Sequence, residues 1–281
     1  MRRLAVVDEI FDARATRRDL VDPVTKAGYV LEFSDQFDAA LDRSHWLPSY
    51  LPQWSSRAQS AARYDVGDGA LRLRIDADQQ PWCPEFDGAT RVSSLQTGVF
   101  AGPVGSAIGQ SRFNPDLVVR EAQDNVRLYT PRYGLFELRA KAIADPACMV
   151  ALWMIGYEDE PERSAEICVC EIFGRDMTPT TAAVGMGLHP FGDPAIVDDF
   201  EAVRLPIDAT DFHTYAVQWT LEFVAFFVDG ELVKTAHQAP DYPMQFMLSV
   251  YEFRDGESGG DGGYPKVFTV DHFRGYRPAG S

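Results

Sequence analysis

Two glutamates lie five positions apart in Ala165-Glu166-Ile167-Cys168-Val169-Cys170-Glu171-Ile172-Phe173-Gly174, a run of strand-forming residues. Side chains of a regular strand alternate between its two faces, so Glu166 and Cys168 share one face and Glu171 points to the other. A β-bulge, which adds one residue to the strand, would return Glu171 to the face of Glu166. The spacing therefore fits either two solvated glutamates on an ordinary edge strand or a close pair of carboxylates.

A close pair of carboxylates is what retaining glycoside hydrolysis requires. One acts as nucleophile and the other as acid and then base, and their carboxyl groups lie roughly 5–5.5 Å apart. The spacing alone favours the edge strand, because pairs of glutamates are common in strands. The flanking sequence has to decide between the two interpretations.

Residues 166–171, Glu-Ile-Cys-Val-Cys-Glu, resemble the catalytic signature of glycoside hydrolase family 16, the laminarinase and lichenase family, in its longer, bulged form. That form reads Glu, aliphatic, Asp, aliphatic, any residue, Glu. Other segments between about residues 30 and 277 resemble the family in the same order, namely 33–38, 68–73, 133–141, 151–156, 211–215, 226–230 and 270–276. An ordered series of this kind is hard to obtain by chance.

The resemblance implies a role for several residues. Glu166 would be the nucleophile and Glu171 the general acid/base, whose pKa a neighbouring ionised carboxylate would raise. Trp153 matches a tryptophan that stacks on a sugar ring, and His189 matches a histidine near the acid/base, where it would support catalysis. For Trp153 the alternative is a place in the core, and for His189 a structural role.

Cys168 departs from the family, which has an aspartate at this position that supports the nucleophile. A thiol is a weak hydrogen-bonding partner and is mostly neutral at pH 7. Because both glutamates are kept, the sequence predicts a tuned or slow enzyme with Cys168 in the supporting position. Loss of catalysis is the alternative.

Further binding residues are predicted less directly. Trp82 and Glu85 lie in a loop that could form a wall of the cleft, and Trp54 and Tyr251 could line it, although surface or packing roles are as consistent with the sequence. The family often carries a structural Ca²⁺, and Asp271 matches one of its ligands, whereas calcium takes six to eight oxygens. No cofactor is expected to be required.

Composition limits the partners. The chain has 281 residues, 46% of them hydrophobic, which is enough for one sizeable core. Its 26 Lys and Arg against 42 Asp and Glu give a formal charge of −16, which argues against nucleic acid or an anionic membrane as partner. A neutral polysaccharide or oligosaccharide fits this charge better.

The four cysteines, at 83, 148, 168 and 170, do not form the pattern of a disulfide framework. Cys168 and Cys170 are expected on the same face of one strand, a poor geometry for a bridge between them. Free thiols suit a reducing compartment. Residues 1–9 hold no apolar run of signal-peptide length, and no long apolar segment follows, so a cytoplasmic location is expected.

The pattern along the chain predicts an all-β fold. Residues 1–28 are interpreted as an N-terminal extension and residues 29–281 as a single β-sandwich catalytic domain. Residues 71–75 and 136–140 alternate between apolar and polar side chains, as half-buried strands do, and Asp229-Gly230 is a strong hairpin signal. The family resemblance specifies a concanavalin-like jelly roll whose concave face holds a glycan cleft.

The sequence as a whole predicts a retaining, endo-acting β-glycoside hydrolase for a β-1,3- or mixed-linked glucan. A transglycosylase of the same fold would use the same two glutamates, with a sugar hydroxyl in place of water. A carbohydrate-binding protein that has lost catalysis is a third reading, which the retention of both glutamates disfavours.

Overall fold

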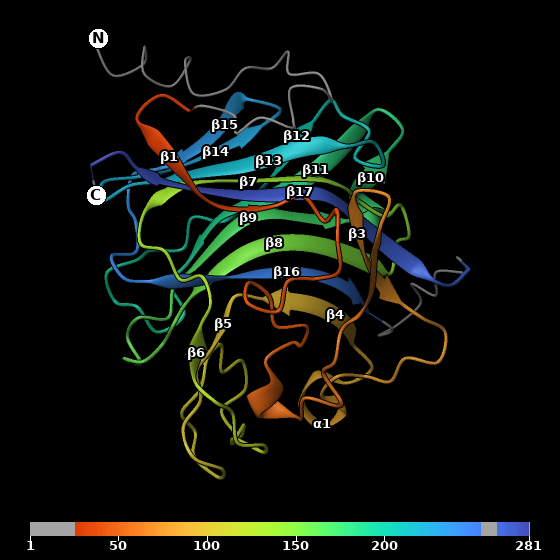
Figure 1. The fold of residues 1–281 in the computed structure, drawn as a ribbon, viewed down its shortest axis with the longest axis vertical. Coiled ribbons are helices and arrows are strands. Elements are labelled where there is room, and N and C mark those ends of the chain that lie inside the picture. Colours follow the sequence, from red (N-terminus) through yellow and green to blue (C-terminus); the bar gives the residue numbers. More distant parts are fainter. Residues whose placement is uncertain (1–25, 254–262, 281) are drawn as a thin grey trace.

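The computed structural model describes residues 26–253 and 263–280, which form two antiparallel sheets packed face to face (Figure 1). The predicted all-β sandwich of the jelly-roll type is confirmed. The predicted N-terminal extension lies outside the described residues up to residue 25, and its separation from the catalytic domain stays a prediction.

The first sheet contains eight strands. They are β1 (Tyr29–Asp35), β2 (Arg63–Gly67), β3 (Ala70–Ile75), β7 (Gly134–Lys141), β13 (His213–Trp219), β14 (Val224–Val228), β15 (Glu231–Ala236) and β17 (Lys266–Pro278). Their order is β15-β14-β13-β7-β17-β3-β2, and β1 pairs with β17.

The second sheet contains seven strands and carries the candidate site. They are β4 (Arg91–Gln96), β8 (Cys148–Gly156), β9 (Glu166–Phe173), β10 (Met177–Thr178), β11 (Thr181–His189), β12 (Glu201–Leu205) and β16 (Met244–Glu252). Their order is β10-β11-β9-β8-β16-β4, and β12 pairs with β11.

Short elements complete the chain. They are the paired strands β5 (Gly98–Val99) and β6 (Val126–Arg127), the helix α1 (Pro84–Asp87), and the 3₁₀ turns η1 (Pro52–Trp54) and η2 (Gly174–Asp176). Among the described residues, no helix is both long and apolar enough to cross a membrane.

Local sequence accounts for the strands and their turns. In β3, Leu71 and Leu73 are fully buried, whereas Arg72 and Arg74 turn outward and bond to Asp65, as the alternation predicts. The predicted hairpin is confirmed, because β14 and β15 are joined by Asp229 and Gly230 alone, both with positive φ. That backbone matches the type I′ turn, which suits the twist of paired strands.

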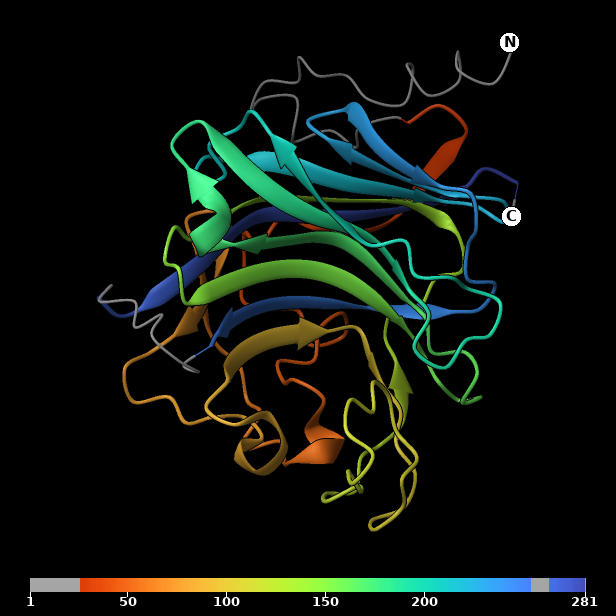
Figure 2. The same cartoon turned by 180° about the vertical axis from the view of Figure 1, so that it is seen from behind.

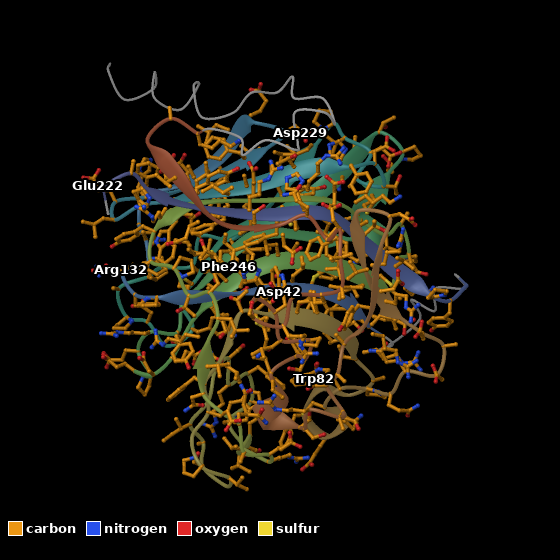
Figure 3. All side chains as sticks on the ribbon, in the orientation of Figure 1. Asp42, Trp82, Arg132, Glu222, Asp229 and Phe246 are labelled. Carbon is orange, nitrogen blue, oxygen red and sulfur yellow. The ribbon has the colours of Figure 1, made fainter. Side chains whose placement is uncertain are left out.

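Two apolar layers hold the molecule together. The main core lies between the sheets and includes Phe136 of β7 and Phe246 of β16. A second cluster packs loops from residues 50–54, 82–86 and 117–119 against β8 and β16 from the other side. Figure 2 shows that the second sheet arches over this loop layer, and Figure 3 places Trp82 within the layer and Phe246 between the sheets. The concave face therefore lies toward the loops.

Candidate active site

A β-bulge in β9 brings the two glutamates to one face. Leu152 of β8 pairs with Cys170, yet the next residue, Trp153, pairs with Cys168, so Val169 is the extra residue. The register with β11 shifts at the same place, between Gly185 opposite Glu171 and Gly187 opposite Cys168. The bulge turns Glu171 back to the face of Glu166, as the bulged motif predicts.

The bulge also separates the two cysteines of β9, so their predicted position on one face is wrong. Cys170 packs in the core between the sheets with Val169, whereas Cys168 faces away from that core toward the carboxylates. All four cysteines are buried, and all are free, in agreement with the absence of a disulfide pattern in the sequence. Cys168 is therefore the thiol that can take part in chemistry on the concave face.

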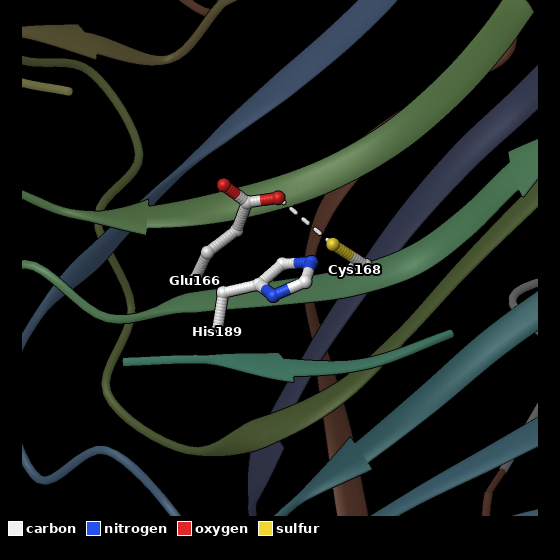
Figure 4. A group of neighbouring side chains, drawn as sticks. All are labelled: Glu166, Cys168 and His189. Carbon is white, nitrogen blue, oxygen red and sulfur yellow. Dashed lines mark hydrogen bonds between the residues drawn. The ribbon is translucent and has the colours of Figure 1, made fainter. Parts of the chain in front are cut away.

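One sulfur contacts both carboxyl groups. The Cys168 thiol donates a hydrogen bond to Glu166 Oε1 at 2.8 Å, and its Sγ lies 3.7 Å from Glu171 Oε1 (Figure 4 shows the first contact). Two carboxyl groups that share one atomic neighbour lie close together. Glu166 is only 6% exposed and Cys168 is fully buried, so the strands hold this arrangement rigidly.

Burial governs the protonation of the site. It raises the pKa of Glu166 to about 8, and the hydrogen bond from Cys168 lowers this pKa only in part. Burial also raises the pKa of Glu171, which the charge of His189 and the thiol contact lower. Burial is thus the main cause of the raised pKa of Glu171, whereas the sequence suggested the neighbouring carboxylate as its cause. Because the two carboxyls interact, their titration belongs to the pair.

The Cys168 thiol stays neutral, since burial and the two carboxylates hold its pKa well above the usual range. We therefore expect Cys168→Asp to add a negative charge beside both glutamates, which raises the pKa of each. A general acid works while protonated, so the alkaline limb of the pH–rate profile should move up by about one pH unit or more. Turnover should also rise, because the nucleophile regains a polar partner.

The measurement for Cys168→Asp is kcat/KM against pH, with Cys168→Asn as the control of similar size and no charge. The asparagine variant should leave the alkaline limb in place. A limb that stays fixed in the aspartate variant as well would mean that residue 168 does not set the pKa of Glu171.

His189 is held next to the carboxylates by its own neighbours. It ends β11 and pairs with Glu166 across the sheet. Its Nδ1 lies 2.9 Å from Asp198 Oδ2, and its ring stacks on Phe200 with centroids 4.8 Å apart. The other ring nitrogen, Nε2, can therefore interact with a group in the cleft. The sequence suggested His189 but not Asp198, which lies nine residues further on in a loop without a motif.

Trp153 lies on the same face as Cys168, because directly paired residues of neighbouring strands share a face. It is 5% exposed and belongs to the cluster under the loops, where its ring meets that of Tyr50 at 6.4 Å. Packing thus accounts for nearly all of its surface. Stacking on a sugar stays a prediction for the small exposed part.

We expect Trp153→Ala to lower the free energy of unfolding by about 3–5 kcal/mol, the usual cost of removing a buried aromatic side chain. Chemical denaturation of the variant measures the loss, and Trp153→Phe serves as control because it keeps most of the packing. Weaker glycan binding by Trp153→Ala with unchanged stability would instead identify a surface residue.

The other predicted binding residues separate into groups. Trp54 and Trp82 are 0% and 1% exposed, and the Trp54 indole donates to the Gln110 carbonyl. Neither ring has a face exposed to a sugar in this structure, and their contact with substrate stays a prediction. Tyr251 packs against Tyr50 at 5.6 Å, and Glu85 pairs with Arg120 on the surface. Roles for Tyr251 and Glu85 stay predictions.

Two residues that the sequence analysis missed lie near Glu166. Tyr50 joins the rings of Trp82, Trp153 and Tyr251, and Glu166 is among the groups that raise the pKa of its hydroxyl, after burial. Glu158 follows β8 in a charged run of the sequence and has a positive φ of 58° in the structure.

Glu158 faces a cavity of about 470 Å³ beside the glutamate pair. Ile155, which pairs with Glu166, lines it together with Ser111, Arg112, Ser164 and Phe191. Burial raises the pKa of Glu158 to about 8, although its carboxylate accepts a hydrogen bond from the Ser111 amide at 2.6 Å. The site thus continues beyond Glu166 into a space with a third carboxyl group, which is half-buried.

Possible metal ligands occur in two places. Asp271, the predicted calcium ligand, pairs instead with Arg139 at 3.1 Å and with His272 at 3.0 Å, in the first sheet. A guanidinium at this carboxylate opposes a cation there, and calcium binding stays a prediction. Within the described ranges, Glu166, Cys168 and His189 form a group whose donor atoms all lie within 4.8 Å of one another.

Comparison with known proteins finds related glycosidases. A model of glycosyl hydrolases family 16 matches residues 128–264. Beta-glucanase of Rhodothermus marinus is 25% identical over 178 residues, covering 52% of this chain and 57% of its own length. Endo-1,3-1,4-beta-glycanase ExsH of Rhizobium meliloti is 26% identical over 250 residues, covering 84% and 51%. The chain spans about half the length of these curated relatives.

Solved structures give the same fold. A GlcNAcα1-4Gal releasing endo-β-galactosidase from Clostridium perfringens is 31% identical with a TM-score of 0.79, over 92% of this chain and 65% of that one. The catalytic domain of an endo-1,3-beta-glucanase (laminarinase) from Thermotoga petrophila is 18% identical with a TM-score of 0.60, over 89% and 98%. The second likeness concerns the fold alone.

Proposed function

We propose that this chain, of which residues 128–264 match the model of glycosyl hydrolases family 16, is a retaining, endo-acting β-glycosidase with Glu166 as nucleophile and Glu171 as acid/base. The observation that carries this proposal is the bulged strand, which turns both carboxyl groups toward one sulfur atom. A regular strand would have left the two groups on opposite faces.

The proposed reaction has two steps. The reactive form of the pair is the one that carries a single proton, on Glu171, and a carboxylate at Glu166. Glu171 gives this proton to the glycosidic oxygen while the Glu166 carboxylate attacks the anomeric carbon, which forms a glycosyl-enzyme and releases one part of the glycan. Glu171, now ionised, then takes a proton from a water molecule that attacks the same carbon. The bond between that carbon and Glu166 breaks, which releases the rest of the glycan and returns Glu166 to its carboxylate form. The thiol of Cys168 orients Glu166 through its hydrogen bond, and the charge of His189 favours the ionised form of Glu171.

A β-1,3- or mixed-linked glucan is the first proposed substrate. The names of both curated relatives support it, and the one that covers 84% of this chain acts on 1,3-1,4-linked glycan by its name. The formal charge of −16 suits a neutral glycan, because an acidic glycan would be repelled.

A β-galactose-containing glycan is the second candidate. The endo-β-galactosidase shares more sequence with this chain than the laminarinase does, 31% against 18%, and superposes with a TM-score of 0.79 against 0.60. That difference favours similar loops around the cleft as well as a similar sandwich.

A panel of glycans tests the proposal. The protein is incubated with laminarin, lichenan, agarose, carrageenan and a glycan that carries GlcNAcα1-4Galβ ends, and products are measured by reducing-sugar assay and mass spectrometry. Oligosaccharides from laminarin or lichenan support the glucan, and a released disaccharide from the last glycan supports the galactoside. No product from any of them would contradict the proposed activity.

A further inference from the structure

A mixed set of donor atoms surrounds the proposed nucleophile. One donor atom each from Glu166, Cys168 and His189 lies within 4.8 Å of the other two (Figure 4). Glu166 and Cys168 belong to β9 and His189 to β11, two strands that pair directly, so the sheet fixes their separation. The His189 side chain is 30% exposed, which leaves the group open toward solvent on that side.

The histidine is oriented as metal-binding histidines are. Its Nδ1 bonds to the Asp198 carboxylate at 2.9 Å, and stacking on Phe200 fixes the ring plane. A carboxylate on one ring nitrogen directs the lone pair of the other nitrogen outward, and such partners raise the basicity of a ligating histidine. Figure 4 shows one ring nitrogen turned toward the Cys168 sulfur. This orientation is independent of the glutamate pair.

The donor set selects the metal. Sulfur, imidazole nitrogen and a single carboxylate oxygen suit Zn²⁺, whereas Ca²⁺ and Mg²⁺ prefer oxygen ligands throughout. Donor atoms of a tetrahedral zinc site lie roughly 3.3–3.8 Å apart. Side-chain movements that displace these donor atoms by about 1 Å would therefore place all three around one ion. Glu171 Oε1 lies 3.7 Å from the same sulfur.

We propose that Zn²⁺ binds Glu166, Cys168 and His189 and reversibly inhibits the hydrolase by occupying its nucleophile. On binding, the Cys168 thiol releases its proton to solvent and the sulfur bonds to the metal as thiolate. Glu166 then donates its oxygen to zinc and cannot attack an anomeric carbon. The binding part stands on the geometry alone, and the inhibition rests on the proposed function.

Metal binding is tested first, without substrate. Chelator-treated full-length protein is titrated with Co²⁺, which should give sulfur-to-cobalt charge-transfer absorption in the near ultraviolet at one ion per chain. Zn²⁺ should abolish that absorption at one equivalent. Cys168→Ser should lose the band, whereas Cys170→Ser, which alters a neighbouring thiol on the core side, should keep it.

The orienting carboxylate gives a second test of binding. Asp198→Asn keeps the size of the side chain and removes its charge, so it should lower zinc affinity about 10–100-fold, the usual effect of losing such a partner. Competition with a chromophoric chelator measures the affinity. Absence of the cobalt band in the wild-type protein, or a band that persists in Cys168→Ser, would overturn the site.

Inhibition is tested on whichever glycan is cleaved. Zn²⁺ should raise the apparent KM with little change in kcat, because metal and substrate compete for Glu166, and a chelator should restore the rate. Cys168→Ser should need at least about tenfold more zinc for the same effect, following the loss of its strongest ligand. Zinc that binds and leaves hydrolysis unchanged, or that is required for hydrolysis, would contradict the inhibition.

The two proposals fail separately. A cobalt band without cleavage of any glycan would refute the proposed hydrolase and leave the metal site in place. Cleavage without a cobalt band or zinc inhibition would refute the metal site and leave the hydrolase.

Discussion

Glu166→Ala is expected to lower turnover by about 10⁴-fold or more, because it removes the group that forms the covalent intermediate. Sodium azide should restore part of the activity toward an aryl glycoside, since the small anion fits the space left by the side chain. Azide attacks from the side that the carboxylate occupied, so the product should be an α-glycosyl azide. Nuclear magnetic resonance of the product measures the anomeric configuration.

Glu158→Ala is the matched control for that result. It also removes a carboxyl group, here a half-buried one, and Glu158 is among the groups that raise the pKa of Glu166. It should give no glycosyl azide, because no covalent step depends on it. An α-glycosyl azide from Glu158→Ala, with none from Glu166→Ala, would identify Glu158 and not Glu166 as the nucleophile.

The bulge could be predicted from the sequence, because the spacing of the two glutamates in the motif implies it. Val169 is the additional residue between two paired positions, and the spacing of Glu166 and Glu171 is one residue longer than same-face alternation allows. The hairpin at Asp229-Gly230 was predictable for a similar local reason, since few residues adopt a positive φ at two successive positions. Information of this kind lies within a few residues of the feature it determines.

The wall of the cleft was not predictable in the same way. Trp54 and Trp82 are fully buried because loops from distant parts of the chain fold over β8 and β16, and no local pattern encodes that contact. Tyr50 lies between three other rings for the same reason. The pairing of Asp198 with His189 likewise depends on where a loop returns to the sheet. These contacts are long-range products of folding.

The sequence also could not predict that burial, more than charge, raises the pKa values of the two glutamates. The motif suggested that an ionised neighbour raises the pKa of the acid, yet desolvation by burial is the largest cause of the raised pKa at both carboxyl groups. Desolvation depends on the packed structure around a group, and sequence spacing does not report it.

Glu171→Ala should behave differently from Glu166→Ala, because a general acid contributes to bond cleavage in proportion to the basicity of the leaving group. Loss of general acid catalysis should lower turnover on a glycan by about 10²–10⁴-fold. An aryl glycoside with an acidic phenol needs little protonation, so its glycosylation step should slow far less. Single-turnover kinetics on both substrates measure this difference.

The pH dependence and the azide product complete the test of Glu171. The pKa of this residue is raised in the folded protein, and the acid acts only while protonated, so activity of the wild-type protein should fall as pH rises through that pKa. Glu171→Ala should lose this alkaline limb. Azide should attack the glycosyl-enzyme on Glu166 and give a β-glycosyl azide, because the first displacement has already inverted the anomeric carbon. An α-glycosyl azide from Glu171→Ala would mean that Glu171 is the nucleophile and Glu166 the acid/base. An unchanged alkaline limb would mean that Glu171 is not the general acid.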